Sequence, residues 1–172
     1  MAKAVFCIAT SLSQAERIVE SLKTSRFSNN DISVLFPDTQ GTKDFAHEKS
    51  TKAPEGAATG AGTGGVLGGV LGWLAGIGAI AIPGIGPFVA AGPIMALLGG
   101  AAVGATVGGI TGALIGMGIP EYEAKRYESK LKEGKILISV HSENSDETDR
   151  AKTIFKNAGA EDISTSGEAS VK

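Results

Sequence analysis

Charged side chains are absent from the middle of this chain. Between residues 56 and 120 the sequence has no Asp, Glu, Lys, Arg or His, although the same stretch holds most of the 25 glycines. All the charge lies in the flanks, where Lys and Arg alternate with Glu and Asp to give a formal net charge of −2. This pattern contains no basic patch, and we therefore expect no nucleic-acid partner.

Cysteine is almost as scarce. Cys7 is the only cysteine, which excludes an intrachain disulfide and a cysteine-rich metal site. A single unpaired thiol is typical of a reducing compartment. The apolar run at residues 4–9 is too short for the hydrophobic core of a signal peptide, and it predicts a buried strand instead. We expect a protein of the cytoplasm or of the cytoplasmic face of the inner membrane.

Catalytic and ligand-binding motifs are lacking too. His47 and His141 have no second histidine or cysteine at ligand spacing, so a solvated histidine is the expectation for both. The segment Gly60-Ala-Gly62-Thr-Gly-Gly65 fits G-x-G-x-x-G, but a glycine-rich stretch produces this match by chance, and the first acid downstream is Glu121. We expect a protein that is not an enzyme and has no catalytic residue, metal site or cofactor.

The two charged flanks follow the same βαβ plan. Residues 4–9 and 32–36 predict strands in the first flank, and Ser13-Gln-Ala-Glu16 matches a capping box at the start of a helix between them. Residues 136–140 and 161–164 predict strands in the second flank. Each intervening helix has apolar residues at i, i+3, i+4 and i+7, namely Ala15, Ile18, Val19 and Leu22, then Ala151, Ile154, Phe155 and Ala158.

The two flanks also align with each other, with Arg17 at the position of Arg150. Two βαβ halves predict an α+β fold: a ferredoxin-like sandwich of four antiparallel strands with two helices on one face. We assign residues 1–40 and 134–172 to this domain. Strands two and three are sequence neighbours in such a fold, so an insertion between them would disturb the sheet least.

The predicted insertion has three parts: a polar linker at residues 41–55, a long glycine-zipper helical hairpin at 56–120 and an amphipathic connecting helix at 121–133. Glycine recurs at every fourth residue on both sides of the hairpin. The residues expected to mediate self-association are Gly60, Gly64, Gly68, Gly72, Gly76, Gly100, Gly104, Gly108, Gly112, Gly116 and Trp73. Positions four apart share one face of a helix, so each arm would present a groove for close backbone packing.

The hairpin arms are predicted at residues 56–82 and 93–119, joined by Pro83-Gly-Ile-Gly-Pro87. Each arm is longer than the about 20 residues that a helix needs to cross a bilayer core. Two interpretations remain open. Either residues 56–120 enter a lipid bilayer, or they pack between the subunits of a soluble homo-oligomer.

The connecting helix has an apolar face formed by Ala124, Tyr127 and Leu131. Its remaining positions mix Lys and Arg with Glu. Such a helix either lies at a membrane surface or packs on the sheet as an ordinary surface helix.

Five segments carry a family resemblance, at residues 51–60, 71–78, 81–87, 116–124 and 159–163. Together they resemble bacterial general stress proteins of the heat-induced and low-temperature-induced type. The resemblance spans nearly the whole chain and implies expression under stress in a cytoplasmic or inner-membrane setting. It brings no catalytic or binding residues with it.

Two functional hypotheses follow from these features. The first is a structural stress-response protein that self-associates through its hairpins, at a membrane or within a soluble homo-oligomer. The alternative is a ferredoxin-like regulatory module that senses a small molecule, and a conspicuous polar pocket would favour it. An enzyme comes third, because nothing in the sequence indicates convergent ionisable groups.

Overall fold

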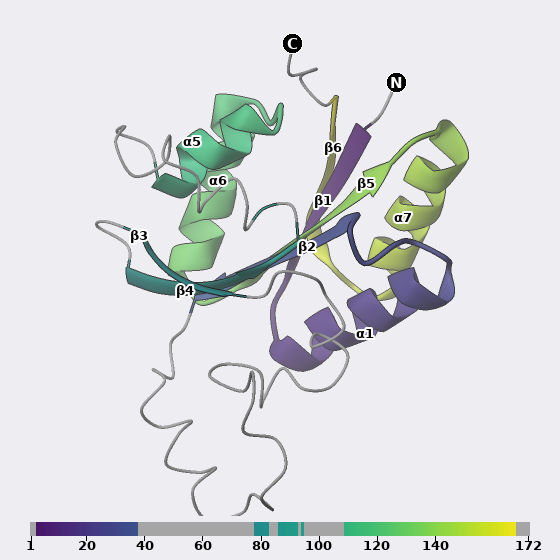
Figure 1. Cartoon of the computed structure of the whole chain (residues 1–172), viewed down its shortest axis with the longest axis horizontal. Coiled ribbons are helices and arrows are strands. Elements are labelled where there is room, and N and C mark those ends of the chain that lie inside the picture. The colour runs from purple at the N-terminus through teal and green to yellow at the C-terminus, as the bar shows by residue number, and fades with distance from the viewer. Residues whose placement is uncertain (1–2, 38–77, 83–85, 93, 95–108, 168–172) are drawn as a thin grey trace, which may run out of the picture.

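The computed structural model describes residues 3–37, 78–82, 86–92, 94 and 109–167 of the chain. These residues form an antiparallel sheet of six strands in the order β3-β4-β2-β5-β1-β6, with helices on both faces (Figure 1). In chain order the elements are β1 (Lys3–Ala9), α1 (Leu12–Thr24), β2 (Ile32–Pro37), β3 (Gly78–Ile82), β4 (Gly86–Ala91), α5 (Gly109–Gly116), α6 (Glu121–Lys132), β5 (Ile136–Ser142), α7 (Ser145–Asn157) and β6 (Glu161–Gly167).

The inner strand β1 is buried on both faces, as its apolar sequence predicts. Val5 and Cys7 belong to a first apolar core, which the sheet shares with α1 and α7. Phe6 and Ile8 belong to a second core, which the sheet shares with α5 and α6 on its other face (Figure 1). Because successive side chains of a strand point to opposite faces, a strand covered on both sides must be apolar throughout.

The first helix begins earlier than predicted, so the capping box at Ser13-Gln-Ala-Glu16 is wrong. The N-cap is Ser11, whose Oγ accepts a hydrogen bond from the backbone N–H of Gln14 (3.2 Å). Gln14 Oε1 in turn accepts from the N–H of Thr10 (2.7 Å), and its amide donates to the carbonyl of Ala158 after α7 (2.9 Å). The buried Gln14 side chain therefore caps α1 and joins it to the neighbouring helix.

The second helix of this pair repeats the arrangement at the aligned position. Asn144 Oδ1 accepts from the N–H of Glu147 (2.9 Å), and Glu147 Oε2 accepts from the N–H of Glu143 (2.8 Å). A side chain one turn into each helix thus reaches back to the residue before the N-cap. The two βαβ flanks share local hydrogen bonding as well as element order.

The C-terminal turns of α1 and α7 correspond in the same way. Arg26 and Gly159 both have left-handed backbone conformations, with φ of 69° and 74°. In each case the next residue donates its N–H to a carbonyl in the last helical turn, that of Leu22 in α1 (3.1 Å) and that of Phe155 in α7 (3.0 Å). This is a Schellman-type helix end, which normally takes glycine at the left-handed position. Only α7 has the glycine.

The α+β class and the antiparallel sheet are as predicted, but the sheet is larger than the predicted four strands. The flanks supply β1, β2, β5 and β6, and the predicted insertion supplies β3 and β4 beside β2. Helices also cover both faces rather than one, since α5 and α6 pack on the second core. The insertion therefore contributes two strands and one of the two helical layers.

The prediction of a helical arm is wrong at residues 78–82, which form β3, and residues 86–91, which lie between the two predicted arms, form β4. β3 and β4 pair with each other, and β4 pairs with β2 from Val34 opposite Ala91 to Pro37 opposite Phe88. Glycine and proline disfavour a helix here, whereas β2 would otherwise present an unpaired edge. The remaining arm residues, 56–77 and 95–108, lie outside the described part of the chain. Within the described ranges, no helix is both long enough and apolar enough to span a membrane.

The connecting helix α6 packs on the sheet through Ala124, Tyr127 and Leu131, the second of the two interpretations above. The Tyr127 hydroxyl donates to the carbonyl of Asp162 (2.7 Å) and lies 2.5 Å from Ser164 Oγ, both in β6. Burial raises the pKa of Tyr127 to about 12. One aromatic side chain thus fastens the second helical layer to the edge strand.

The unequal helix ends predict opposite effects of substitution. We expect Arg26→Gly to raise the free energy of unfolding by about 1 kcal/mol, because glycine adopts a left-handed conformation without steric cost. Gly159→Ala should lower it by a similar amount. Urea denaturation followed by circular dichroism measures both. Destabilisation by Arg26→Gly would contradict the equivalence of the two turns.

The buried tyrosine predicts a loss of stability at alkaline pH. The pKa of Tyr127 is higher in the folded state than in the unfolded chain, so its contribution is complete below about pH 10 and is lost as the pH rises towards 12. The urea midpoint of the protein should fall between pH 9 and pH 11.5, and Tyr127→Phe should reduce that fall. Tyr122→Phe, at an exposed position of the same helix, is the control and should leave the fall unchanged.

Candidate functional site

Most residues predicted to mediate self-association lie outside the described part of the chain. They are Gly60, Gly64, Gly68, Gly72, Gly76, Gly100, Gly104, Gly108 and Trp73. The structure describes the last two members of the series, Gly112 and Gly116, which lie in α5.

The helix α5 is fixed by its inner face and by its neighbour. Ile110 and Leu114 are buried in the second core, and Thr111 Oγ1 donates a hydrogen bond to Glu128 of α6. These contacts orient the helix, so its opposite face points away from the sheet. The described residues of α5 carry no charge at all.

The outward face of α5 is formed by Gly112, Ile115 and Gly116, and we call it the α5 face. All three are exposed, and Ile115 keeps 43% of its surface accessible. A Cβ atom built at Gly112 or at Gly116 would meet no other atom within 4 Å. The described chain therefore packs nothing against these glycines, and close backbone packing at this face would need a partner that the described residues do not supply.

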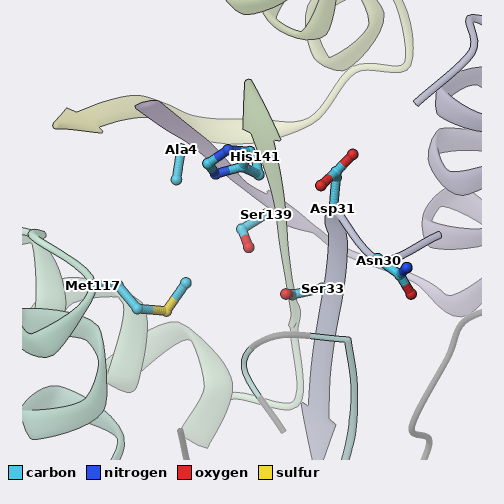
Figure 2. Close-up of a pocket in the computed structure, with 7 residues that line it drawn as sticks. All are labelled: Ala4, Asn30, Asp31, Ser33, Met117, Ser139 and His141. Atoms are coloured by element: carbon cyan, nitrogen blue, oxygen red, sulfur yellow. The ribbon is translucent and has the colours of Figure 1, made fainter. Parts of the chain in front are cut away.

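A cavity of about 210 Å³ lies at one end of β2 and β5, on the sheet face that α5 and α6 cover. Its lining consists of Ala4, Asn30, Asp31, Ser33, Met117, Ser139 and His141 (Figure 2). We call it the β2–β5 cavity. The α5 face and the β2–β5 cavity are the two candidate sites.

The pairing of β2 with β5 brings the polar residues of the cavity together. Ser33 lies opposite Ser139 in the ladder, and the N–H of His141 donates to the carbonyl of Asp31 (2.8 Å) one step further on. Alternate residues of a strand share a face, so these four residues form a polar block at the strand ends. Figure 2 shows the Ser33, Ser139 and His141 side chains on the side of the strands that faces Met117.

The chain that follows β4 packs directly against this block. Gly92 has a φ of 79°, and a Cβ built there would lie 2.0 Å from the carbonyl oxygen of Ile32. Two residues later the N–H of Ile94 donates to Ser33 Oγ (3.2 Å), and the Ile94 side chain is buried in the second core. The close approach at Gly92 thus fixes the Ser33 hydroxyl.

The lining offers one carboxylate, one imidazole, two hydroxyls and one amide, which suits hydrogen bonding and charge pairing with a small polar molecule. The described residues contain no cluster of three or more His, Cys, Asp or Glu that could hold a metal ion. Cys7 lies in the first core, on the opposite face of the sheet from the β2–β5 cavity. Burial raises the pKa of its thiol well above the usual value, so the thiol stays protonated and unreactive.

Sequence reasoning found the cavity residues only in part. His47 lies outside the described residues, whereas His141 is half-buried in the cavity rather than a fully solvated histidine. Ser33 and Ser139 were missed, although each interrupts an otherwise apolar strand, and that interruption is the available signal. Met117 was also missed, because nothing local indicates that the connection between α5 and α6 reaches the strand ends.

Comparisons of the chain with protein-family models, with curated proteins and with solved structures found no match. The resemblance to bacterial general stress proteins therefore depends on the sequence segments given above, and it assigns no residue to either candidate site.

The close approach at Gly92 gives a prediction for the cavity. We expect Gly92→Ala to lower the free energy of unfolding by roughly 1–3 kcal/mol, because the side chain meets the backbone of β2 in a left-handed conformation. Gly112→Ala is the control, since its Cβ meets open space in a helix, and it should raise the free energy of unfolding by up to about 1 kcal/mol. Urea denaturation of both variants measures the contrast, and equal effects would contradict the packing at Gly92.

Proposed function

We propose that this chain is a non-enzymatic stress-response protein that self-associates through the α5 face and the glycine-rich stretch at residues 56–120. The association would take place in the cytoplasm, within a homo-oligomer, or at the cytoplasmic face of the inner membrane. The observation that carries the proposal is the α5 face, where an exposed isoleucine lies between two glycines on an uncharged helix.

The geometry of the α5 face suits contact between two helices. Gly112, Ile115 and Gly116 stand at i, i+3 and i+4, so they share one side of the helix. An isoleucine beside two glycines provides a knob next to a groove, and small residues of this spacing let two helix backbones approach closely. A second copy of the same face could receive the knob in its own groove, which is the self-complementary arrangement of a two-fold contact.

The energetic cost of the glycines supports the same proposal. Glycine in an exposed helix interior is about 1 kcal/mol less favourable than alanine. Inside the described chain nothing offsets this cost, because no atom lies within 4 Å of a Cβ built at Gly112 or Gly116. Contacts between copies would offset it and would also remove the exposed surface of Ile115 from water.

Substitutions that the monomer tolerates test this proposal. Gly112→Leu should not lower the urea midpoint, because leucine favours a helix more than glycine does and a Cβ at this position meets no atom within 4 Å. It should fill the groove between copies and weaken association by at least about tenfold, which corresponds to about 1.4 kcal/mol. Sedimentation velocity over a range of protein concentrations measures the weakening.

Lys156→Leu, which adds a leucine to the exposed surface of α7, is the matched control and should leave the size distribution unchanged. Equal sedimentation of Gly112→Leu and the unsubstituted protein would contradict assembly through the α5 face. Fractionation of cells separates the two settings: recovery in an alkali-resistant membrane pellet supports the membrane, and recovery as a large particle without detergent supports the homo-oligomer.

A small-molecule-sensing regulatory module is the second candidate, and the β2–β5 cavity favours it. Asp31, Ser33, Ser139 and His141 converge there, where β2 and β5 pair. This second proposal includes a ferredoxin-like fold for the two flanks. The βαβ order of both flanks, and the packing of α1 and α7 together on the first core, support it.

A further inference from the structure

The β2–β5 cavity is lined by two buried serines, and the described residues use the hydroxyl group of only one of them for hydrogen bonding. Ser33 and Ser139 are 2% and 3% exposed. Ser33 Oγ accepts from the N–H of Ile94, whereas the Ser139 hydroxyl makes no hydrogen bond to any residue that the structure describes. Because Ser139 lines the cavity, its hydroxyl group is available for a hydrogen bond to a molecule that enters it.

The charge of the lining selects the sign of the ligand. Asp31 supplies a carboxylate, and none of the described residues that line the cavity is a lysine or an arginine. Among the described residues, the Asp31 carboxylate takes part in no ion pair and no side-chain hydrogen bond. An anionic ligand would meet an unpaired negative charge, whereas a cationic ligand would neutralise it in a partly desolvated site.

The size and the apolar part of the lining limit the ligand further. A volume of about 210 Å³ equals roughly seven water molecules at about 30 Å³ each, so the part of a ligand that lies inside the cavity is small. Ala4 and the Met117 side chain contribute an apolar wall opposite the polar block (Figure 2). A short hydrocarbon segment fits that wall, with polar groups at the ends of the molecule.

We propose that the β2–β5 cavity binds a small hydroxylated primary amine, with its ammonium group on the Asp31 carboxylate and its hydroxyl group on Ser139 Oγ. The inference rests on the second proposed function and names its ligand class. The Asp31 carboxylate has two oxygens that can accept hydrogen bonds from the three donors of an ammonium group. Self-association through the α5 face is independent of this inference.

Three probes of equal length but different charge test the ligand class: ethanolamine, ethylene glycol and glycolate. Each is titrated into the full chain while backbone amide signals are followed by nuclear magnetic resonance. We expect ethanolamine alone to shift the signals of Ser33, Ser139 and His141, with a dissociation constant in the millimolar range, as is typical of so small a ligand.

Substitution of the two contact residues tests the assignment of the groups. Asp31→Asn keeps the size of the side chain and removes its charge, so it should weaken ethanolamine binding at least tenfold. Ser139→Ala should weaken it about threefold to tenfold. Asp149→Asn, an exposed acid on α7, is the matched control and should leave the affinity unchanged. Urea denaturation of each variant confirms that it is folded.

The possible outcomes test the amine class of the ligand separately from the ligand-binding function of the protein. Selective binding of ethanolamine that depends on Asp31 supports the inference. Equal or tighter binding of ethylene glycol or glycolate overturns the amine class and leaves a ligand-binding function in place. Absence of binding by all three probes, with the protein folded, overturns both the amine class and the second proposed function.

Discussion

The structure depends on one constraint: helices cover both faces of the sheet with their apolar sides. β1 and β5 are inner strands of this arrangement, and their apolar side chains enter either the first core or the second. Residues 4–9 of β1 and 136–138 of β5 are therefore apolar without interruption, and the four described helices are held by their buried faces. Tyr127 shows how strongly the second layer is fastened, because its hydroxyl reaches through the core to the backbone of β6.

The same constraint explains why the polar block at the ends of β2 and β5 is unusual. Within a buried strand a serine is unfavourable unless it is hydrogen-bonded, and Ser33 has a partner only because the chain after β4 passes directly over it. Ser139 lies beside it without such a partner. The block therefore forms where the second helical layer ends, since α5 and α6 cover the sheet only as far as the connection that contains Met117.

The flanks were predictable because their signals are local. The apolar runs of β1 and β5 and the i, i+3, i+4 faces of α1 and α7 depend only on neighbouring residues, and the structure has these elements. The capping box was misplaced by a short distance, because Ser11 and Ser13 both fit an N-cap and only the contact of Gln14 with Ala158 selects one of them.

The error at β3 and β4 has a different cause. A stretch of Gly, Ala and Ile suits a helical groove and a strand equally, and the open edge of β2 decides between them. The cavity depends on register in the same way: a slip of one residue between β2 and β5 would place Ser33 and Ser139 on opposite faces.

The predicted insertion supplies β3, β4, α5 and α6, and this limits how the chain can be divided into independent parts. An insertion that merely decorated a complete domain could be removed or transplanted without loss. Here the residues between β2 and β5 pair with one edge of the sheet that the flanks build and pack on one of its faces. Without them, Phe6, Ile8 and Leu137 would face water and β2 would offer its backbone to other chains. The two ends of this polypeptide are consequently not an autonomous module, and the segment that separates them in sequence completes them in space.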